Sequence, residues 1–146
     1  MYNILLAIDG SEHSEKVIDE TITIAKALGA HVTVLHVTGE YDFKTRISVH
    51  ISDDYWEQIR KNLRAEAEKI VDKAAEKLRK HGIEAETSVL VGKQSPADGV
   101  CKMADRGDFN LLVLGSRGIK GIKEAFLGSV SNKVAHCTIK NVLIVK

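Results

Sequence analysis

The chain has 146 residues, of which 44% are hydrophobic, and its 21 lysines and arginines nearly balance 20 aspartates and glutamates. This length predicts one domain with one core over residues 1–146, and the balanced charge gives no general attraction to nucleic acid or to an acidic membrane. No apolar run approaches the roughly 20 residues of a membrane span, and the first residues lack a basic flank and a cleavage signal, so we expect a soluble, cytoplasmic protein.

The two cysteines, Cys101 and Cys137, stand far apart and belong to no CxxC or His/Cys cluster. This pattern argues against a disulfide framework and equally against a zinc site. We expect both to be small hydrophobic residues in the core.

The first third of the chain predicts strand, helix and strand. Residues 4–8 form a continuous apolar run, as in a strand covered on both faces. Ser11 is a suitable cap for a helix of apolar period that stops at Gly29. A β-branched strand follows at 31–37, and the polar segment 38–52 is compatible with a mobile loop, a lid or the start of the next helix.

The rest of the chain continues the alternation of helices and strands. The predicted elements are a long amphipathic helix from residue 53 or 54 to about 81, a strand at 84–91, a helix at 95–106, a strand at 110–115, a helix at 129–136 and a strand at 141–146. This alternation predicts right-handed crossovers, a parallel sheet and helices on both of its faces.

A ligand of such a sheet binds beyond the carboxyl ends of the strands, where the winding reverses direction. Asp9 ends the first predicted strand and Gly115 the fourth. If these two strands are neighbours, both residues line one crevice.

The stretch that follows Gly115 is rich in glycine, with the spacing G-x2-G-x9-G at Gly115, Gly118 and Gly128. Ser129 and Ser131 then begin a helix. Glycines admit close approach to the backbone, and helix N-termini attract anions. The pattern therefore suits a phosphate chain, with added charge from nearby basic residues, which are Arg117, Lys120 and Lys123.

Each of these residues also has a purely structural interpretation. Ser129 is a suitable helix cap, the glycines fit ordinary turns, and Asp9 fits an Asx turn that starts a helix without any ligand. The pattern alone leaves the two interpretations about even.

Two segments make the chain similar to a known family. ILLAIDGSEHSEKV resembles the opening strand and helix of the universal stress proteins, and GSRG followed by LGSVSNKV resembles their nucleotide signature. The resemblance extends from Asn3 to the C-terminus. It implies a Rossmann-like, single-domain α/β fold, an open five-stranded parallel sheet of order 3-2-1-4-5, and ATP as the ligand. We expect Mg²⁺ to be shared among the ATP phosphates.

The resemblance also implies the site residues and the mode of assembly. Ala7, Asp9 and Val37 would line the adenine and ribose end, and the ribose and phosphates would be held by Gly115, Arg117, Gly118, Gly128, Ser129, Val130 and Ser131. Members commonly dimerise through the last strand, and an apolar edge strand from Val142 to Val145 independently requires a partner. We therefore expect a homodimer.

Three functions remain open at this point. The first is a nucleotide-dependent regulator in stress response with an unknown protein partner. The second is a slow ATPase or phosphotransferase whose missing catalytic group comes from a partner or from the segment 38–52. The third is a ligand-independent dimeric interaction module. No catalytic group is apparent in the sequence, because we expect His13 to be solvated and His36 to be packed or hydrogen-bonded in the core. No P-loop and no GxGxxG motif occurs.

Overall fold

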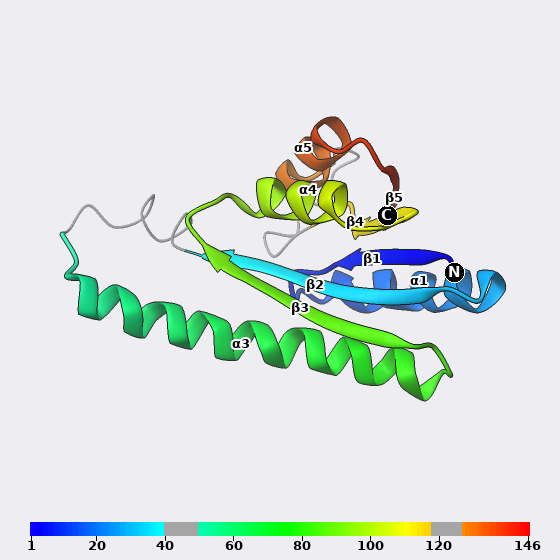
Figure 1. Cartoon of the computed structure of the whole chain (residues 1–146), viewed down its shortest axis with the longest axis horizontal. Coiled ribbons are helices and arrows are strands. Elements are labelled where there is room, and N and C mark those ends of the chain that lie inside the picture. Colours follow the sequence, from blue (N-terminus) through cyan, green and yellow to red (C-terminus); the bar gives the residue numbers. More distant parts are fainter. Residues whose placement is uncertain (40–49, 118–126) are drawn as a thin grey trace.

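The structure is a computed structural model, and it describes residues 1–39, 50–117 and 127–146. Strands and helices alternate along the chain (Figure 1). In order they are β1 (Asn3–Ala7), α1 (His13–Leu28), β2 (His31–Gly39), α3 (Asp53–Lys80), β3 (Ala85–Gly92), α4 (Pro96–Arg106), β4 (Leu111–Gly115), α5 (Ser129–Cys137) and β5 (Asn141–Val145).

The five strands form one parallel sheet of order β3-β2-β1-β4-β5, which confirms the predicted fold class. β1 lies at the centre and pairs with β2 on one side and β4 on the other. Ile4, Leu5 and Leu6 are fully buried because helices cover both faces of this strand. The sequence shows this burial as an unbroken apolar run.

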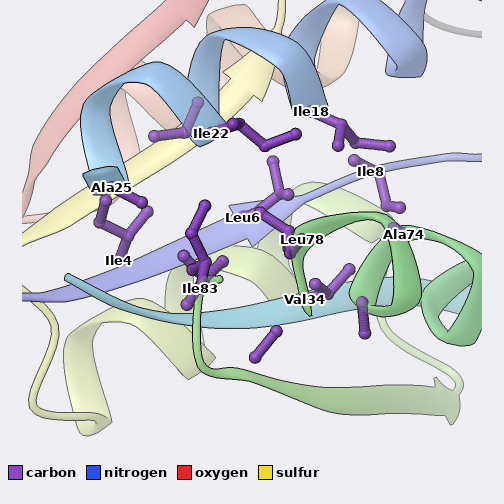
Figure 2. Packing of buried hydrophobic residues seen from close by; sticks show 14 of the residues in the cluster. Ile4, Leu6, Ile8, Ile18, Ile22, Ala25, Val34, Ala74, Leu78 and Ile83 are labelled. Carbon is purple, nitrogen blue, oxygen red and sulfur yellow. The ribbon is translucent and has the colours of Figure 1, made fainter. Parts of the chain in front are cut away.

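Over the part of the chain that the structure describes, two helices cover each face of the sheet. α1 and α3 pack on one face, and α4 and α5 pack on the other, above the sheet in Figure 1, where α3 lies below it. Figure 2 shows the first of these layers, in which Leu6 of β1 lies between Ile22 of α1 and Leu78 of α3. Among the described residues, no helix is both long enough and apolar enough to cross a membrane.

The start of α4 and the end of α1 follow the sequence signals, whereas the start of α1 does not. Ser95 caps α4 by accepting the amide of Asp98 at 3.3 Å, and Gly29 ends α1 in the left-handed region at φ 58°. Ser11, predicted to cap α1, does not do so: Glu12 occupies the cap position and makes no side-chain cap bond. The Ser11 prediction was wrong because the Asp9 carboxylate organises this turn instead.

The predicted apolar stripe of α3 is buried only over its second half. Its buried residues begin at Ala67, whereas Trp56, Ile59 and Leu63 are half-buried. In Figure 1 the amino-terminal part of α3 extends beyond the strands. The helix is therefore longer than the sheet it covers.

Cys101 and Cys137 form a disulfide bond, which contradicts the expectation that they are unlinked core residues. Their Cα atoms lie 6.1 Å apart although 36 positions separate them in the chain. α4 and α5 pack side by side on one face, and this contact brings the sulfur atoms together. The spacing of the two cysteines carries no signal of that contact.

Candidate functional site

The sequence predicts the ligand crevice beyond the carboxyl ends of β1 and β4. These strands are neighbours, with Ala7 opposite Leu114. Asp9, just after β1, and Gly115, the last residue of β4, therefore lie at the same edge of the sheet. The chain leaves β1 for α1 on one face and reaches α5 on the other face after β4. This is the switch point at which α/β sheets bind ligands.

Asp9 is half-buried and forms the Asx turn that leads into α1. Its Oδ1 accepts a hydrogen bond from the Ser11 amide at 2.9 Å and another from Ser14 Oγ at 3.1 Å. Among the described residues its Oδ2 has no hydrogen-bond partner. The carboxylate therefore performs the structural role and still presents one oxygen to a ligand.

The backbone of Ser116 is bonded both to the end of β5 and to the residue before α5. We did not predict this role of Ser116 from the sequence. Its amide donates to Val145 O at 2.8 Å, and its carbonyl accepts the Gly128 amide at 2.8 Å. Residue 117 and residue 127 therefore leave the fold at nearly one point. No side-chain signal marks Ser116, because its backbone makes both bonds.

α5 begins without a side-chain cap. Gly128 occupies the cap position, and Ser129 is the first helical residue. The interpretation of Ser129 as the cap was therefore wrong, and its exposed hydroxyl serves no capping role. The first amides of a helix have no partner within it and carry a partial positive charge. Ser129 and Val130 offer this uncapped first turn at the surface.

Ser131 also lies in the first turn of α5 but is only 2% exposed. Its hydroxyl donates to Gly128 O at 3.0 Å and lies 3.5 Å from Ser116 O. Its hydroxyl thus serves the helix start in this conformation, and its predicted role at phosphates remains a prediction.

Gly115 lacks a side chain where a histidine packs. A Cβ atom on Gly115 would lie 2.7 Å from His13 Cδ2 and 3.1 Å from Val17 Cγ2. The His13 ring is half-buried and its Nε2 lies 3.0 Å from Val145 O. The expectation that His13 is solvated was wrong, because the bare strand end accepts its ring.

The remaining predicted residues fall into three groups. Ala7 and Val37 are 9% and 7% exposed and belong to the core beneath α4, where a Cβ on Gly99 would meet Val37 Cγ1 at 2.6 Å. Arg117 is exposed. Gly118 lies outside the described residues, as do Lys120, Lys123 and most of the segment 38–52.

His36 is hydrogen-bonded as expected, with Nδ1 2.7 Å from Ile8 O. Over residues 1–39, 50–117 and 127–146, no three His, Cys, Asp or Glu side chains are grouped to hold a metal ion.

A groove of about 380 Å³ lies between α1 and α3, on the face opposite α5. Three lysines line it, Lys73, Lys77 and Lys80, and each pairs with a carboxylate. Lys77 contacts Asp19 at 2.7 Å and Glu15 at 2.9 Å.

These contacts raise the pKa of Lys77; the hydrogen bond to Asp19 is the largest cause and the hydrogen bond to Glu15 is the next. The hydrogen bond from Lys77 in turn lowers the pKa of Glu15. The positive charge of the groove is thus largely neutralised. The groove is a poorer anion site than the first turn of α5.

Comparisons with known proteins agree with the observed fold. A family model described as "Universal stress protein family" matches residues 1–146. Universal stress protein YxiE of Bacillus subtilis (strain 168) is 38% identical over 150 residues, which cover 100% of both chains.

Two solved structures extend the similarity to three dimensions. Hypothetical protein MJ0577 of Methanocaldococcus jannaschii superposes with a TM-score of 0.83 and 26% identity, over 99% of this chain and 94% of that one. A universal stress protein in complex with cAMP gives a TM-score of 0.67 and 25% identity, over 99% and 95%. The chain belongs to the universal stress protein family.

Proposed function

We propose that this protein binds ATP at the crevice beyond β1 and β4 and acts as a nucleotide-dependent regulator in stress response. The observation that carries the proposal is the uncapped start of α5, with the exposed Ser129 hydroxyl in its first turn. An anion placed there gains both unpartnered amides and the helix dipole.

The phosphates would lie against the first turn of α5. Ser129 and Val130 offer amides at the surface, and the Ser129 hydroxyl adds a donor. Gly128 brings the backbone close, since it carries no side chain next to Ser116 O. Exposed Arg117, at the start of the same loop, adds positive charge. Mg²⁺ would neutralise part of the phosphate charge when it enters with the nucleotide.

The sugar and base would lie toward Asp9, whose Oδ2 accepts a hydrogen bond from a ribose hydroxyl or a base amine. The choice of adenine rests on the family, in which a structural relative was solved with cAMP. Ala7 and Val37 would contribute an apolar floor at this end of the crevice.

Calorimetric titration of nucleotide-free protein with Mg-ATP, beside Mg-GTP, tests the proposal. We expect a dissociation constant on the order of micromolar for ATP and weaker binding of GTP. Gly128→Ala should weaken ATP binding about tenfold or more, because its Cβ would lie 3.1 Å from Ser116 O at the phosphate position.

Gly29→Ala is the matched control. Gly29 also lies next to a helix, but no atom lies within 4 Å of its added Cβ, and only its φ of 58° opposes the change. This variant should lose about 1 kcal/mol of stability and bind ATP as the wild type does. Absence of heat with folded wild-type protein would refute the proposal.

A ligand-independent interaction module is the second candidate, and two contacts favour it. The His13 ring packs where a Gly115 side chain would lie, which gives this glycine a structural reason. The Ser131 hydroxyl donates to the carbonyl oxygens of Ser116 and Gly128. Under this hypothesis Gly128→Ala changes stability alone. An assay of sustained phosphate release from ATP separates both candidates from an enzyme, since a regulator releases phosphate slowly or not at all.

We further propose that the protein is a homodimer paired through β5. β5 is an edge of the sheet, and Val142, Leu143 and Ile144 are each only partly buried. An apolar edge strand requires cover. Light scattering should give about twice the chain mass of 16.0 kDa, and a mass of one chain at high concentration would exclude the dimer.

A further inference from the structure

The disulfide between Cys101 and Cys137 joins the two helices that cover one face of the sheet. Cys101 lies within α4, and Cys137 is the last residue of α5. The chain between them contains β4, the glycine motif and the whole of α5. The segment that carries the proposed phosphate contacts therefore lies between the two cysteines in the chain.

The two sulfurs differ in access. Cys101 is 6% exposed and packs in the core beneath α4, whereas Cys137 is exposed at the carboxyl end of α5. Thiol–disulfide exchange requires a thiolate to reach one sulfur of the bond. Only Cys137 offers such an approach, so the bond has a defined point of attack.

The surroundings also accommodate the reduced pair. Cys101 Sγ lies 3.8 Å from Val134 O, and Cys137 Sγ lies 3.9 Å from Ala97 O. Both distances suit a thiol donating to a carbonyl oxygen, so each free thiol would find an acceptor without moving far.

Other contacts hold α5 against α4 without the bond. Lys133 of α5 pairs with Asp98 of α4 at 3.0 Å. Beyond the end of α5, Thr138 Oγ1 donates to Asp105 Oδ1 at 2.5 Å and the Ile139 amide to the same oxygen at 3.1 Å. These contacts flank the cysteines on both sides, and we expect the helices to stay packed after reduction.

We infer that Cys101 and Cys137 form a reversible thiol–disulfide site that a dithiol reductant attacks at Cys137. A thiolate of the reductant bonds to Cys137 Sγ, the bond between the cysteines breaks, and Cys101 leaves as a thiolate that takes a proton from water. The second thiol of the reductant then displaces Cys137, which is protonated in turn. The reductant loses two electrons and becomes a disulfide, and the cysteine pair gains them.

The test uses the folded, full-length protein. A thioredoxin-type dithiol protein whose second cysteine is replaced by serine cannot complete the exchange and stays joined to the attacked sulfur. We expect peptide mass mapping to find this adduct on Cys137. The intact reductant should release two thiols per chain, and oxidised glutathione should restore the bond.

Single-cysteine variants test the difference in access separately. Cys101→Ser leaves Cys137 free, and Cys137→Ser leaves Cys101 free. The native Cys101→Ser variant should react with a maleimide at least about tenfold faster than the Cys137→Ser variant. Circular dichroism and equal labelling rates in urea serve as controls that both variants are folded and fully reactive.

Three results would overturn the inference. The first is an adduct on Cys101 or equal labelling rates in the two folded variants. The second is a bond that the reductant opens only after denaturation, which would make it a purely structural link. The third is isolated protein with two free thiols that no oxidant joins.

Discussion

Gly115 lies at the candidate site, at the end of β4, and also packs against His13 and Val17 of α1. Its missing side chain leaves room for the His13 ring, whose Nε2 contacts Val145 O at the end of β5. One glycine thus allows α1 to be linked to the edge strand across β4. The bare backbone beside the crevice has a packing role whether or not a nucleotide binds.

Gly115→Ala should destabilise the protein by about 1–3 kcal/mol, the usual cost of a methyl group forced into a packed position. The new Cβ would displace the His13 ring at 2.7 Å and press on Val17 at 3.1 Å. Urea unfolding of the wild type and the variant measures the change in the free energy of unfolding.

A double-mutant cycle identifies the cause of that loss. His13→Ala removes the ring, so Gly115→Ala should cost at least about 0.5 kcal/mol less in that background than in the wild type. Strictly additive effects of the two substitutions would contradict the contact between Gly115 and His13.

At the scale of elements, charged contacts join α1 to α3 across the top of their shared core. Glu15 of α1 contacts two lysines of α3. Its Oε2 accepts a hydrogen bond from Lys77 Nζ at 2.9 Å, and its Oε1 lies 3.3 Å from Lys73 Nζ. These lysines, Lys77 foremost, hold the pKa of Glu15 below its ordinary value of 4.5. The Glu15 side chain is 46% exposed, so solvent screens the interaction.

Glu15→Gln should lower stability at pH 7 by less than about 1 kcal/mol. Because the pKa of Glu15 is lowered in the fold, its contribution is complete above about pH 5 and is lost as pH falls through 4.5 to the folded pKa. Urea midpoints of the wild type and the variant should therefore converge as pH falls below 4.5. Glu68→Gln, at an exposed carboxylate of α3, is the control. A gap that stays constant with pH would contradict this account.

On the other face, the disulfide is the strongest link between α4 and α5. A cross-link between residues 36 positions apart lowers the conformational entropy of the unfolded chain. In the chain-entropy model this raises the free energy of unfolding by about 4 kcal/mol. Cys137→Ser should lose a large part of that stability in urea unfolding under non-reducing conditions. In dithiothreitol the wild type and the variant should unfold at similar urea concentrations, and a difference that persists there would point to packing at Cys137 instead.

At the scale of the whole molecule, the order of the elements could be predicted because each leaves a local trace. Buried strands such as β1 and β4 are apolar runs, and Ser95 and Gly29 mark helix ends. The sheet order required the family resemblance, since local patterns do not say which strands are neighbours.

The candidate site was predictable in its frame but not in its contacts. Asp9 does follow β1, Gly115 does end the adjacent strand β4, and Gly128 does precede a helix. Three contacts join residues that are distant in the sequence. They are the contact of His13 with Val145, the backbone hydrogen bonds of Ser116 and the disulfide. Such contacts depend on the packing of α1 and of α4 against α5, which no short motif encodes.

The most direct measurement of the central claim is an NMR titration of amide signals with Mg-ATP. We predict saturable shifts at Ser129, Val130 and Ser131, together with shifts near Asp9. Lys73 and Lys77, in the groove between α1 and α3, should change little. Shifts confined to that groove, or none at saturating ATP, would contradict a phosphate site at the start of α5.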